Sequence, residues 1–284
     1  MTVSRHVFVT GCAGTIAFAA LGSRAALADG IRSLDHLVIM SNDLEAAVSS
    51  YRALGFTVVP GGEHPVGTHN ALVAFQDGAY LELIAFKRPN DQHQWWSVAQ
   101  AGGGFIDFCM ATDDLTGSIK AFRDAGVNMS DPVPGSRVRP DGYKLSWVVA
   151  RALPPFAFQA PFLIQDNTPR QERVGTQTNH PNGVIGIANI ILASEDVARV
   201  RSWWSPVLGQ PGTEIQHPDI GAVGVRFMAG PHSLDFVEPK EPSSPIAAWL
   251  KTRGASPYAI ALKTTSGKTG PLDEMKSGTR IILV

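Results

Sequence analysis

Apolar and polar residues follow one repeated pattern in three stretches of the chain. The stretches read LDHLVIMSNDLEAAVSSYRALGF from residue 34, FIDFCMATDDLTGSIKAFRDAGV from residue 105 and GIANIILASEDVARVRSWWSPVLGQ from residue 186. Each opens with an apolar run of strand length, then reaches an aspartate 7 residues after a fixed strand position and a glycine 19 or 20 residues after it, as in His36, Asp43 and Gly55. Three copies of one spacing indicate an internal repeat.

Each repeat predicts a strand, then a helix, then three further strands. In the first copy Asn42 can cap the helix, with Glu45 three residues later as in a capping box, and Leu44 and Val48 fall on one helical face. Gly55 ends the helix in a conformation that glycine adopts at little cost. The runs FTVVP, NALVAFQDG and AYLELIAF follow, separated by Pro-Gly-Gly and Asp-Gly turns.

The later copies extend the same order of elements. The second continues through YKLSWVVA and PFLIQ, and the third continues through AVGVRFMA and SLDFVEP. A fourth beginning, YAIALKTTS, and a last strand, RIILV, predict a truncated copy at the C-terminus. The predicted fold class is therefore α+β, built from tandem βαβββ modules.

The first 28 residues have three interpretations. Gly11, Gly14 and Ala17 after a short strand resemble the glycine turn of a dinucleotide-binding fold. A lipoprotein cleavage before Cys12 would leave about five apolar residues, fewer than the roughly 7–15 of an export signal. The third interpretation is a signal peptide over residues 1–28 that is cleaved after Ala28.

We favour the signal peptide because the segment LVIMSND, which a dinucleotide fold would use as its second strand, already belongs to the repeat. The expected location is then periplasmic or secreted, and a cytoplasmic protein is the alternative. Outside residues 7–28 no apolar stretch approaches the roughly 20 residues of a membrane span, so we expect no permanent membrane anchor.

Composition limits the partners. The chain has 284 residues, is 44% hydrophobic and carries a net charge of −1 from 24 basic and 25 acidic residues without long runs. No basic stripe is present that would bind nucleic acid. Beyond Cys12 the chain has one cysteine, Cys109, and its apolar neighbours favour a core residue over a catalytic thiol.

Two polar residues interrupt otherwise apolar strands. Because side chains alternate across a strand, His36 shares a face with Val38 and Met40. Glu82 stands between Leu81 and Leu83. An unpaired buried carboxylate is very costly, so Glu82 requires a cation or a hydrogen-bond donor.

These motifs resemble a known family. The segments DHLVIMSNDLEAA, LGFTVVPGGEHPVGTHNALVAF, GAYLELIAF, GSRVRPDGYKLSW, PFLIQ and HPNGV are similar to glyoxalase-like domain proteins of the vicinal oxygen chelate superfamily. The resemblance implies curved mixed sheets around a metal-binding cup. It places a glyoxalase-like domain of two modules at residues 33–178 and the third module with the truncated copy at residues 179–284.

The resemblance also implies a ligand set. In the superfamily the first and last strands of two paired modules each supply one inward ligand, and these positions here are His36, Glu82, Asp107 and Gln165. Such donors suit a divalent Zn, Mn, Fe, Ni or Mg ion. Glu82 and Asp107 are then the candidates for proton transfer. The alternative is a metal-free cup in which His36 donates to Glu82 or Asp107.

A second group of candidates lies in loops that match family motifs. His64, Thr68 and Asn70, with Arg137 and Arg139, combine hydrogen-bond donors with fixed positive charge. This set suits a substrate that carries a carboxylate, phosphate or enolate. In the alternative interpretation, the polar residues shape turns and the arginines are solvated.

The resemblance implies a metal-dependent lyase or isomerase, or a dioxygenase, acting on a small oxygen-rich substrate through an enediolate. The rival is a non-catalytic protein that sequesters a small molecule in the same cup. A third class is an assembly role in which the third module pairs with another chain, for example in a homodimer.

Overall fold

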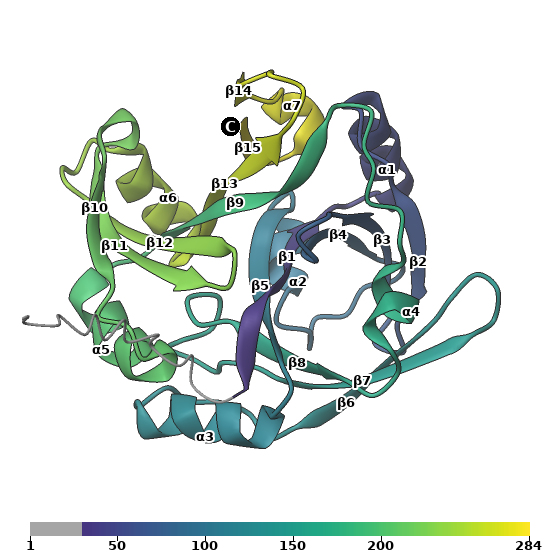
Figure 1. Cartoon of the computed structure of the whole chain (residues 1–284), viewed down its shortest axis with the longest axis horizontal. Helices are drawn as coiled ribbons and strands as arrows, with labels where there is room; N and C mark the ends of the chain where they lie inside the picture. The colour runs from purple at the N-terminus through teal and green to yellow at the C-terminus, as the bar shows by residue number, and fades with distance from the viewer. Residues whose placement is uncertain (1–29) are drawn as a thin grey trace, which may run out of the picture.

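The computed structural model describes residues 30–284, and the predicted signal peptide lies outside them. Eight strands form a closed barrel in the order β1-β4-β3-β2-β6-β7-β8-β5 (Figure 1). They are β1 (Ile31–Met40), β2 (Val59–Glu63), β3 (Thr68–Ala74), β4 (Tyr80–Phe86), β5 (Gly104–Thr112), β6 (Val133–Val138), β7 (Lys144–Ala150) and β8 (Phe162–Asp166).

Two copies of the predicted module make this barrel. In each copy the first strand pairs in parallel with the last, as β1 with β4 and β5 with β8. The copies join through antiparallel pairs of β1 with β5 and of β2 with β6, which closes the sheet on itself. The structure confirms the predicted α+β class and its duplicated βαβββ modules.

The helix of each module begins at the repeated aspartate. The carboxylates of Asp43, Asp114 and Asp196 accept hydrogen bonds from backbone N–H groups three residues later, at 2.8–3.0 Å. They cap α1 (Leu44–Ala53), α3 (Leu115–Asp124) and α5 (Val197–Leu208). The prediction of Asn42 as the cap of the first helix is wrong by one residue, because the acceptor oxygen belongs to Asp43.

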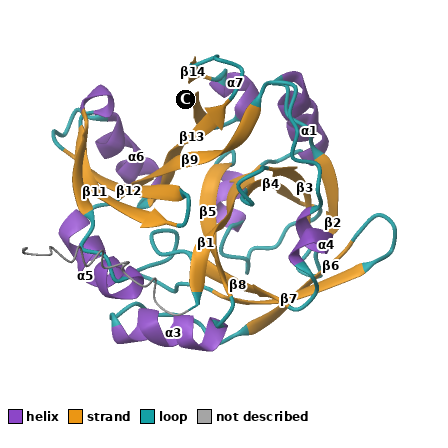
Figure 2. Cartoon of the chain, in the orientation of Figure 1, coloured by secondary structure: helices purple, strands orange, loops and turns teal. Residues whose placement is uncertain are grey.

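The third module and the truncated copy form a second sheet in the order β10-β11-β12-β9-β13-β15-β14 (Figure 2). Its strands are β9 (Val184–Ala193), β10 (Thr213–His217), β11 (Ala222–Ala229), β12 (His232–Pro239), β13 (Ser256–Thr264), β14 (Gly270–Pro271) and β15 (Arg280–Leu283). The remaining helices are α2 (Trp96–Gln100), α4 (Arg170–Val174), the 3-10 turn η1 (Pro218–Ile220), α6 (Pro245–Arg253) and α7 (Glu274–Ser277).

The main apolar core lies outside the barrel. It joins outward side chains of β1 and β4, such as Leu37 and Leu81, to α1, α3, α5 and the second sheet. Trp203 and Trp204 are fully buried there, and their stacked rings have centroids 5.1 Å apart. Cys109 is also buried, in a smaller apolar cluster. Over residues 30–284, no helix has the length and hydropathy needed to cross a membrane.

In the second sheet a salt bridge occupies the position that Glu82 has in the first module. Asp235 of β12 is fully buried and accepts hydrogen bonds from Arg226 at 2.6 and 2.7 Å and from His217 at 2.8 Å. Although burial alone would raise the pKa of Asp235, these partners hold it below its ordinary value. A carboxylate already paired in this way has little capacity left for a ligand.

The lowered pKa of Asp235 gives a pH-dependent contribution to stability. The unfolded chain binds this proton more readily than the folded one, so the contribution is complete above about pH 4 and is lost as the pH falls further. We expect Asp235→Asn to reduce the free energy of unfolding by about 1–3 kcal/mol at pH 7, a modest value because Arg226 is partly exposed. The reduction should be smaller in acid, where the contribution of Asp235 decreases. Urea unfolding at pH 7 and pH 3.5 measures the two reductions, and Asp219→Asn is the control because Asp219 is exposed.

Candidate active site

The barrel encloses a cavity of about 480 Å³. Inward side chains of β1, β3, β4, β6, β7 and β8 line it, and the lining residues include five members of one apolar cluster: Ile84, Trp95, Val149, Phe162 and Ile164. The polar and charged residues that line it include His36, His64, Thr68, Asn70, Tyr80, Glu82, His93, Ser136, Arg137, Arg151 and Arg173. The predicted cup is thus the interior of the barrel.

His36 and Glu82 meet inside this cavity. Their strands pair in parallel with Val38 opposite Glu82, so both side chains lie on the inner face. The His36 Nε2 and Glu82 Oε2 atoms are 3.4 Å apart, and the two residues are only 3% and 6% exposed. The sequence pattern predicted two polar residues on an apolar face, and the barrel brings them into contact.

A buried carboxylate orients the other ring nitrogen of His36. The pairing of β1 with β5 shifts register between Leu34 and His36, and Asp35 Oδ1 lies 2.6 Å from His36 Nδ1. Asp35 also binds Arg170 and Arg173 of α4, the latter at 3.0 Å. Burial alone would raise the pKa of Asp35, but Arg173 and the His36 hydrogen bond keep it well below its ordinary value. Asp35 is therefore a fixed anion.

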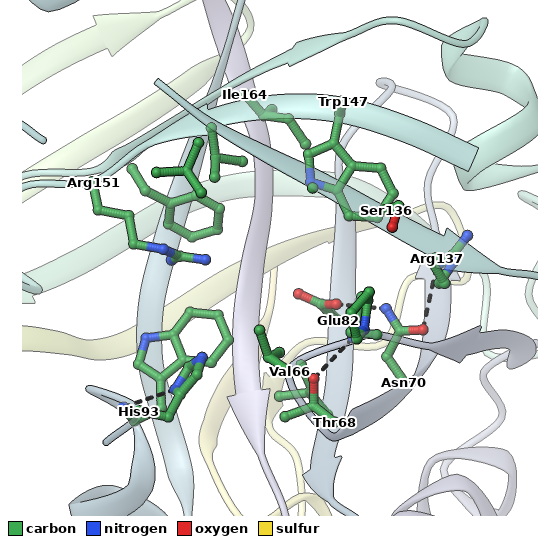
Figure 3. A pocket seen from close by; sticks show the side chains of 18 of the residues that line it. Val66, Thr68, Asn70, Glu82, His93, Ser136, Arg137, Trp147, Arg151 and Ile164 are labelled. Atoms are coloured by element: carbon green, nitrogen blue, oxygen red, sulfur yellow. Dashed lines mark hydrogen bonds between the residues drawn. The ribbon is translucent and has the colours of Figure 1, made fainter. Parts of the chain in front are cut away.

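Glu82 is held by a short chain of side chains. Asn70 Nδ2 donates to Glu82 Oε1 at 2.5 Å, and Arg137 Nη1 donates to Asn70 Oδ1 at 3.2 Å (Figure 3). Burial opposes ionisation of Glu82, yet the hydrogen bond and charge of His36 lower its pKa to about 2. The pKa of His36 is raised in turn, against the effect of burial, by Asp35 and Glu82. Glu82 is thus ionised at neutral pH.

His64 adds a neutral base to the cavity wall. Its Nδ1 lies 2.9 Å from Thr68 Oγ1. Burial, reinforced by nearby arginines, lowers its pKa to about 4. His64, Thr68, Asn70 and Arg137, which were predicted from the loop motifs, therefore do line the same cavity as His36 and Glu82.

The structure does not bring Gln165 to the cavity. Its Oε1 accepts a hydrogen bond from Leu115 N at the start of α3, at 2.8 Å. The prediction matched Gln165 to Glu82, but the pairing shows a different equivalence: Val38 lies opposite Glu82, and Cys109 lies opposite Phe162. The true counterpart of Glu82 is thus three residues earlier, and an odd shift reverses the face of the strand.

Asp107 and Arg139 also lie away from the cavity surface. Asp107 accepts hydrogen bonds from Trp95 Nε1 at 3.2 Å and from Phe108 N at 2.9 Å, and burial raises its pKa to about 6. Arg139 forms ion pairs with Asp141 and, at 2.9 Å, with Glu172. Neither residue is among those that line the cavity.

Asp35, His36 and Cys109 form a geometrically possible metal site, with ligand atoms within 4.8 Å of one another. Two of the three are poor donors. Asp35 is already neutralised by two arginines, and burial raises the pKa of the Cys109 thiol well above its ordinary value, whereas a metal binds the thiolate. The better metal ligands are His36 Nε2 and Glu82, and Asp35 orients the His36 ring through its hydrogen bond with Nδ1.

Several cavity residues were missed by the sequence analysis. Arg173 contacts Asp35, Asp166 and the Tyr80 hydroxyl from a five-residue helix, and Arg151 follows β7 at the opposite wall. The one available signal was Asp35 itself, a charge inside an apolar strand. No local pattern indicates which distant arginine neutralises it.

Known structures show the same fold. A hypothetical protein from Staphylococcus aureus is 15% identical with a TM-score of 0.66, and the match covers 88% of this chain and 98% of that chain. A 4-hydroxymandelate synthase variant from Streptomyces coelicolor is 14% identical with a TM-score of 0.54, covering 83% of this chain and 71% of that chain. At these identities the likeness concerns the fold alone. A comparison with curated protein sequences finds no significant match.

The sequence itself matches a family profile over more than half of its length. The profile is that of the glyoxalase-like domain, and it aligns with residues 34–208. The match covers both modules of the barrel and runs through α5 of the third module, beyond the end at residue 178 that the sequence motifs indicated. The chain belongs to the glyoxalase-like domain family.

Proposed function

We propose that the barrel cavity is the active site of a lyase or isomerase that moves a proton on a small oxygen-rich substrate. The observation that supports this function is the buried pair of His36 and Glu82, which faces a cavity and is held from behind by charged partners. Burying a carboxylate and an imidazole costs folding free energy, so a functional role would explain why both are present. Perturbed ionisable groups of this kind gather at functional sites.

A divalent ion is part of the proposal. The 3.4 Å between His36 Nε2 and Glu82 Oε2 is long for a charge-assisted hydrogen bond. It is close to the roughly 3.3 Å that separates two ligand atoms at about 2.0–2.1 Å from one tetrahedral ion. Asp35 accepts a hydrogen bond from the Nδ1–H group of His36, so the lone pair of Nε2 is available to bind the ion. Bound there, the ion would polarise vicinal oxygens of a substrate and acidify the adjacent C–H group.

The protein residues supply the remaining steps. The Asn70–Arg137 pair fixes the Glu82 carboxylate. Trp147 and Ile164 line the cavity and would exclude water from a bound substrate. His64 is neutral and lines the cavity, so we assign it the role of proton acceptor. The sequence analysis gave this role to Asp107 or Glu82. Asp107 instead positions Trp95, and a carboxylate with a pKa near 2 is a weak base.

The proton-transfer step can be tested without knowing the natural substrate. Purified protein is mixed in D2O with a panel of small α-hydroxy ketones, α-hydroxy aldehydes and 2-hydroxy acids, and NMR follows exchange of the proton on the carbon next to the carbonyl. We expect accelerated exchange for at least one compound. Exchange at the uncatalysed rate across the whole panel would contradict the proposal.

A specific observation favours a second candidate, a metal-free binding protein. The second module contributes Phe162 and Ile164 to the inner face, so its last strand adds no oxygen or nitrogen donor beside His36 and Glu82. Such a cavity could hold an organic ligand by packing and arginine contacts alone.

Metal analysis and a chelator separate the two candidates. We expect wild-type protein to contain a stoichiometric divalent metal and His36→Ala and Glu82→Ala to lack it. A bound ion at about 100 times its Kd stabilises the fold by about 2.7 kcal/mol. Chelation should then lower the Tm by roughly 5–10 °C in wild type alone. Equal metal content in all three proteins, with no response to chelator, would favour the metal-free binder.

A further inference from the structure

Arg151 is a charged residue of the cavity with an unsatisfied donor. It follows β7 directly and lines the cavity wall opposite Asn70 and Arg137 (Figure 3). Its Nη1 atom is buried and has no hydrogen-bond partner among the described residues. A buried donor of a charged group that remains unsatisfied is costly, so the position favours an acceptor that the protein itself does not provide.

Two aromatic rings fix the guanidinium in place. The Arg151 Cζ atom lies 5.0 Å from the centroid of the Trp95 ring and 4.8 Å from that of Phe162. The Trp95 ring is itself held by its hydrogen bond to Asp107 at 3.2 Å. Cation–π contacts occupy the faces of the guanidinium and leave its N–H edges free for hydrogen bonds.

Other arginines that line the cavity already have partners. Arg173 is paired with Asp35 and Asp166, and Arg137 donates to Asn70 and to the Arg173 carbonyl group. Arg137 also lacks a carboxylate within salt-bridge distance, and its Nε is buried without a partner among the described residues, but both its terminal nitrogens donate to protein acceptors. The Arg151 guanidinium has neither a carboxylate within salt-bridge distance nor a hydrogen-bond acceptor among residues 30–284. Its positive charge is therefore free to attract an anion.

His93 supplies a second donor close to the same wall. Its Nδ1 accepts a hydrogen bond from Trp95 N at 3.2 Å, and its ring lies 5.1 Å from the Trp95 ring. Burial and, to a lesser extent, the charge of Arg151 lower its pKa to about 4, so the ring is neutral. With Nδ1 as the acceptor, the proton resides on Nε2, which makes Nε2 a donor.

We propose that Arg151, together with His93, forms an anion subsite that binds a carboxylate group of the substrate. This inference rests on the proposed function for the other end of the substrate, whose vicinal oxygens would face His36 and Glu82. The substrate class is then a small carboxylic acid that carries further oxygens. A carboxylate fits better than a phosphate because the subsite has one planar cation between aromatic walls, and the terminal nitrogens of Arg137 and Arg173 already donate to protein acceptors.

Binding of small acids and their amides tests the subsite directly. Calorimetric titration of the full-length, chelator-treated protein uses two pairs of probes, benzoate with benzamide and lactate with lactamide, and inorganic phosphate as a further probe. We expect a carboxylate to bind wild type more tightly than its amide, and Arg151→Gln to weaken carboxylate binding by roughly 10- to 100-fold. Arg151→Lys, which retains the charge without the planar fork, should weaken it less. Arg139→Gln, which removes a guanidinium outside the cavity, should bind as wild type does.

Three outcomes would overturn the subsite: carboxylates that bind no better than amides, equal binding by wild type and both Arg151 variants, or tighter binding of phosphate than of either carboxylate. The result is independent of the metal and of turnover. If Arg151 governs carboxylate binding while no panel compound exchanges its proton, the subsite stands and the proposed reaction fails. Normal exchange together with carboxylate binding that does not depend on Arg151 would support the reaction and refute the subsite.

Discussion

Replacing Glu82 by Gln should lower the rate of catalysed proton exchange by roughly 10²- to 10³-fold, which is the usual range for loss of one group that stabilises the charge of the transition state. Glutamine has the shape of glutamate, so its Oε1 can still accept the hydrogen bond from Asn70. The substitution removes the negative charge that faces His36 and weakens any ion held between them. NMR exchange rates and metal content, measured on the same samples, check both effects.

Glu63→Gln is the matched control for this variant. Glu63 lies in β2 of the same barrel, but its side chain is 64% exposed and pairs with Lys87 at the surface. We expect the control to retain wild-type exchange and metal content. A Glu82→Gln protein that is folded, as judged by circular dichroism, and exchanges protons at the wild-type rate would refute the assigned role of Glu82.

Replacing Asp35 by Asn should reduce the free energy of unfolding by about 3–5 kcal/mol, a larger loss than that expected for Asp235→Asn. Asp35 is fully buried and is the shared counter-ion of Arg170 and Arg173, of which Arg173 is only 3% exposed. Asparagine leaves Asp166 as the one carboxylate paired with the buried Arg173. The same substitution frees His36 Nδ1 from a charged acceptor, so metal affinity should fall as well.

Urea unfolding measures this loss, and Asp113→Asn is its control. Asp113 pairs with Arg32 at the surface, where both side chains are more than half exposed, and such a pair contributes at most about 1 kcal/mol. We expect a clearly lower midpoint for Asp35→Asn and a nearly unchanged midpoint for Asp113→Asn. Similar midpoints for the two variants would show that the buried cluster does not stabilise the barrel.

Together the two substitutions separate chemistry from architecture. Glu82→Gln preserves shape and removes a charge that faces the cavity, whereas Asp35→Asn removes a charge that faces protein. If Asp35→Asn also lowers exchange in protein that remains folded, its effect passes through His36, since the carboxylate lies behind that ring. A change in kcat without a change in KM would agree with such a positioning role.

The misplacement of Gln165 in the predicted ligand set has a physical origin. The two modules can be aligned by sequence where both have a capped helix followed by a glycine. The last strands contain no such shared residue that would fix the alignment. A shift of three residues assigned Gln165 to a face that Phe162 and Ile164 occupy. Asp107 does have the strand position equivalent to His36, because Val38 lies opposite Asp107 and His36 lies opposite Cys109, but its carboxylate accepts a hydrogen bond from Trp95 and does not line the cavity.

The sequence by itself determined the repeated module, the apolar inner strands and the two polar positions, His36 and Glu82, that such strands do not tolerate without a reason. These features are local, because periodicity and capping depend on residues a few positions apart. Only the tertiary structure decided which residues complete the site. Asp35 and Arg173 are 138 residues apart in the chain, and Arg151 acquires its surroundings from Trp95 and Phe162. Such contacts depend on barrel closure and strand register, which no short stretch of sequence encodes.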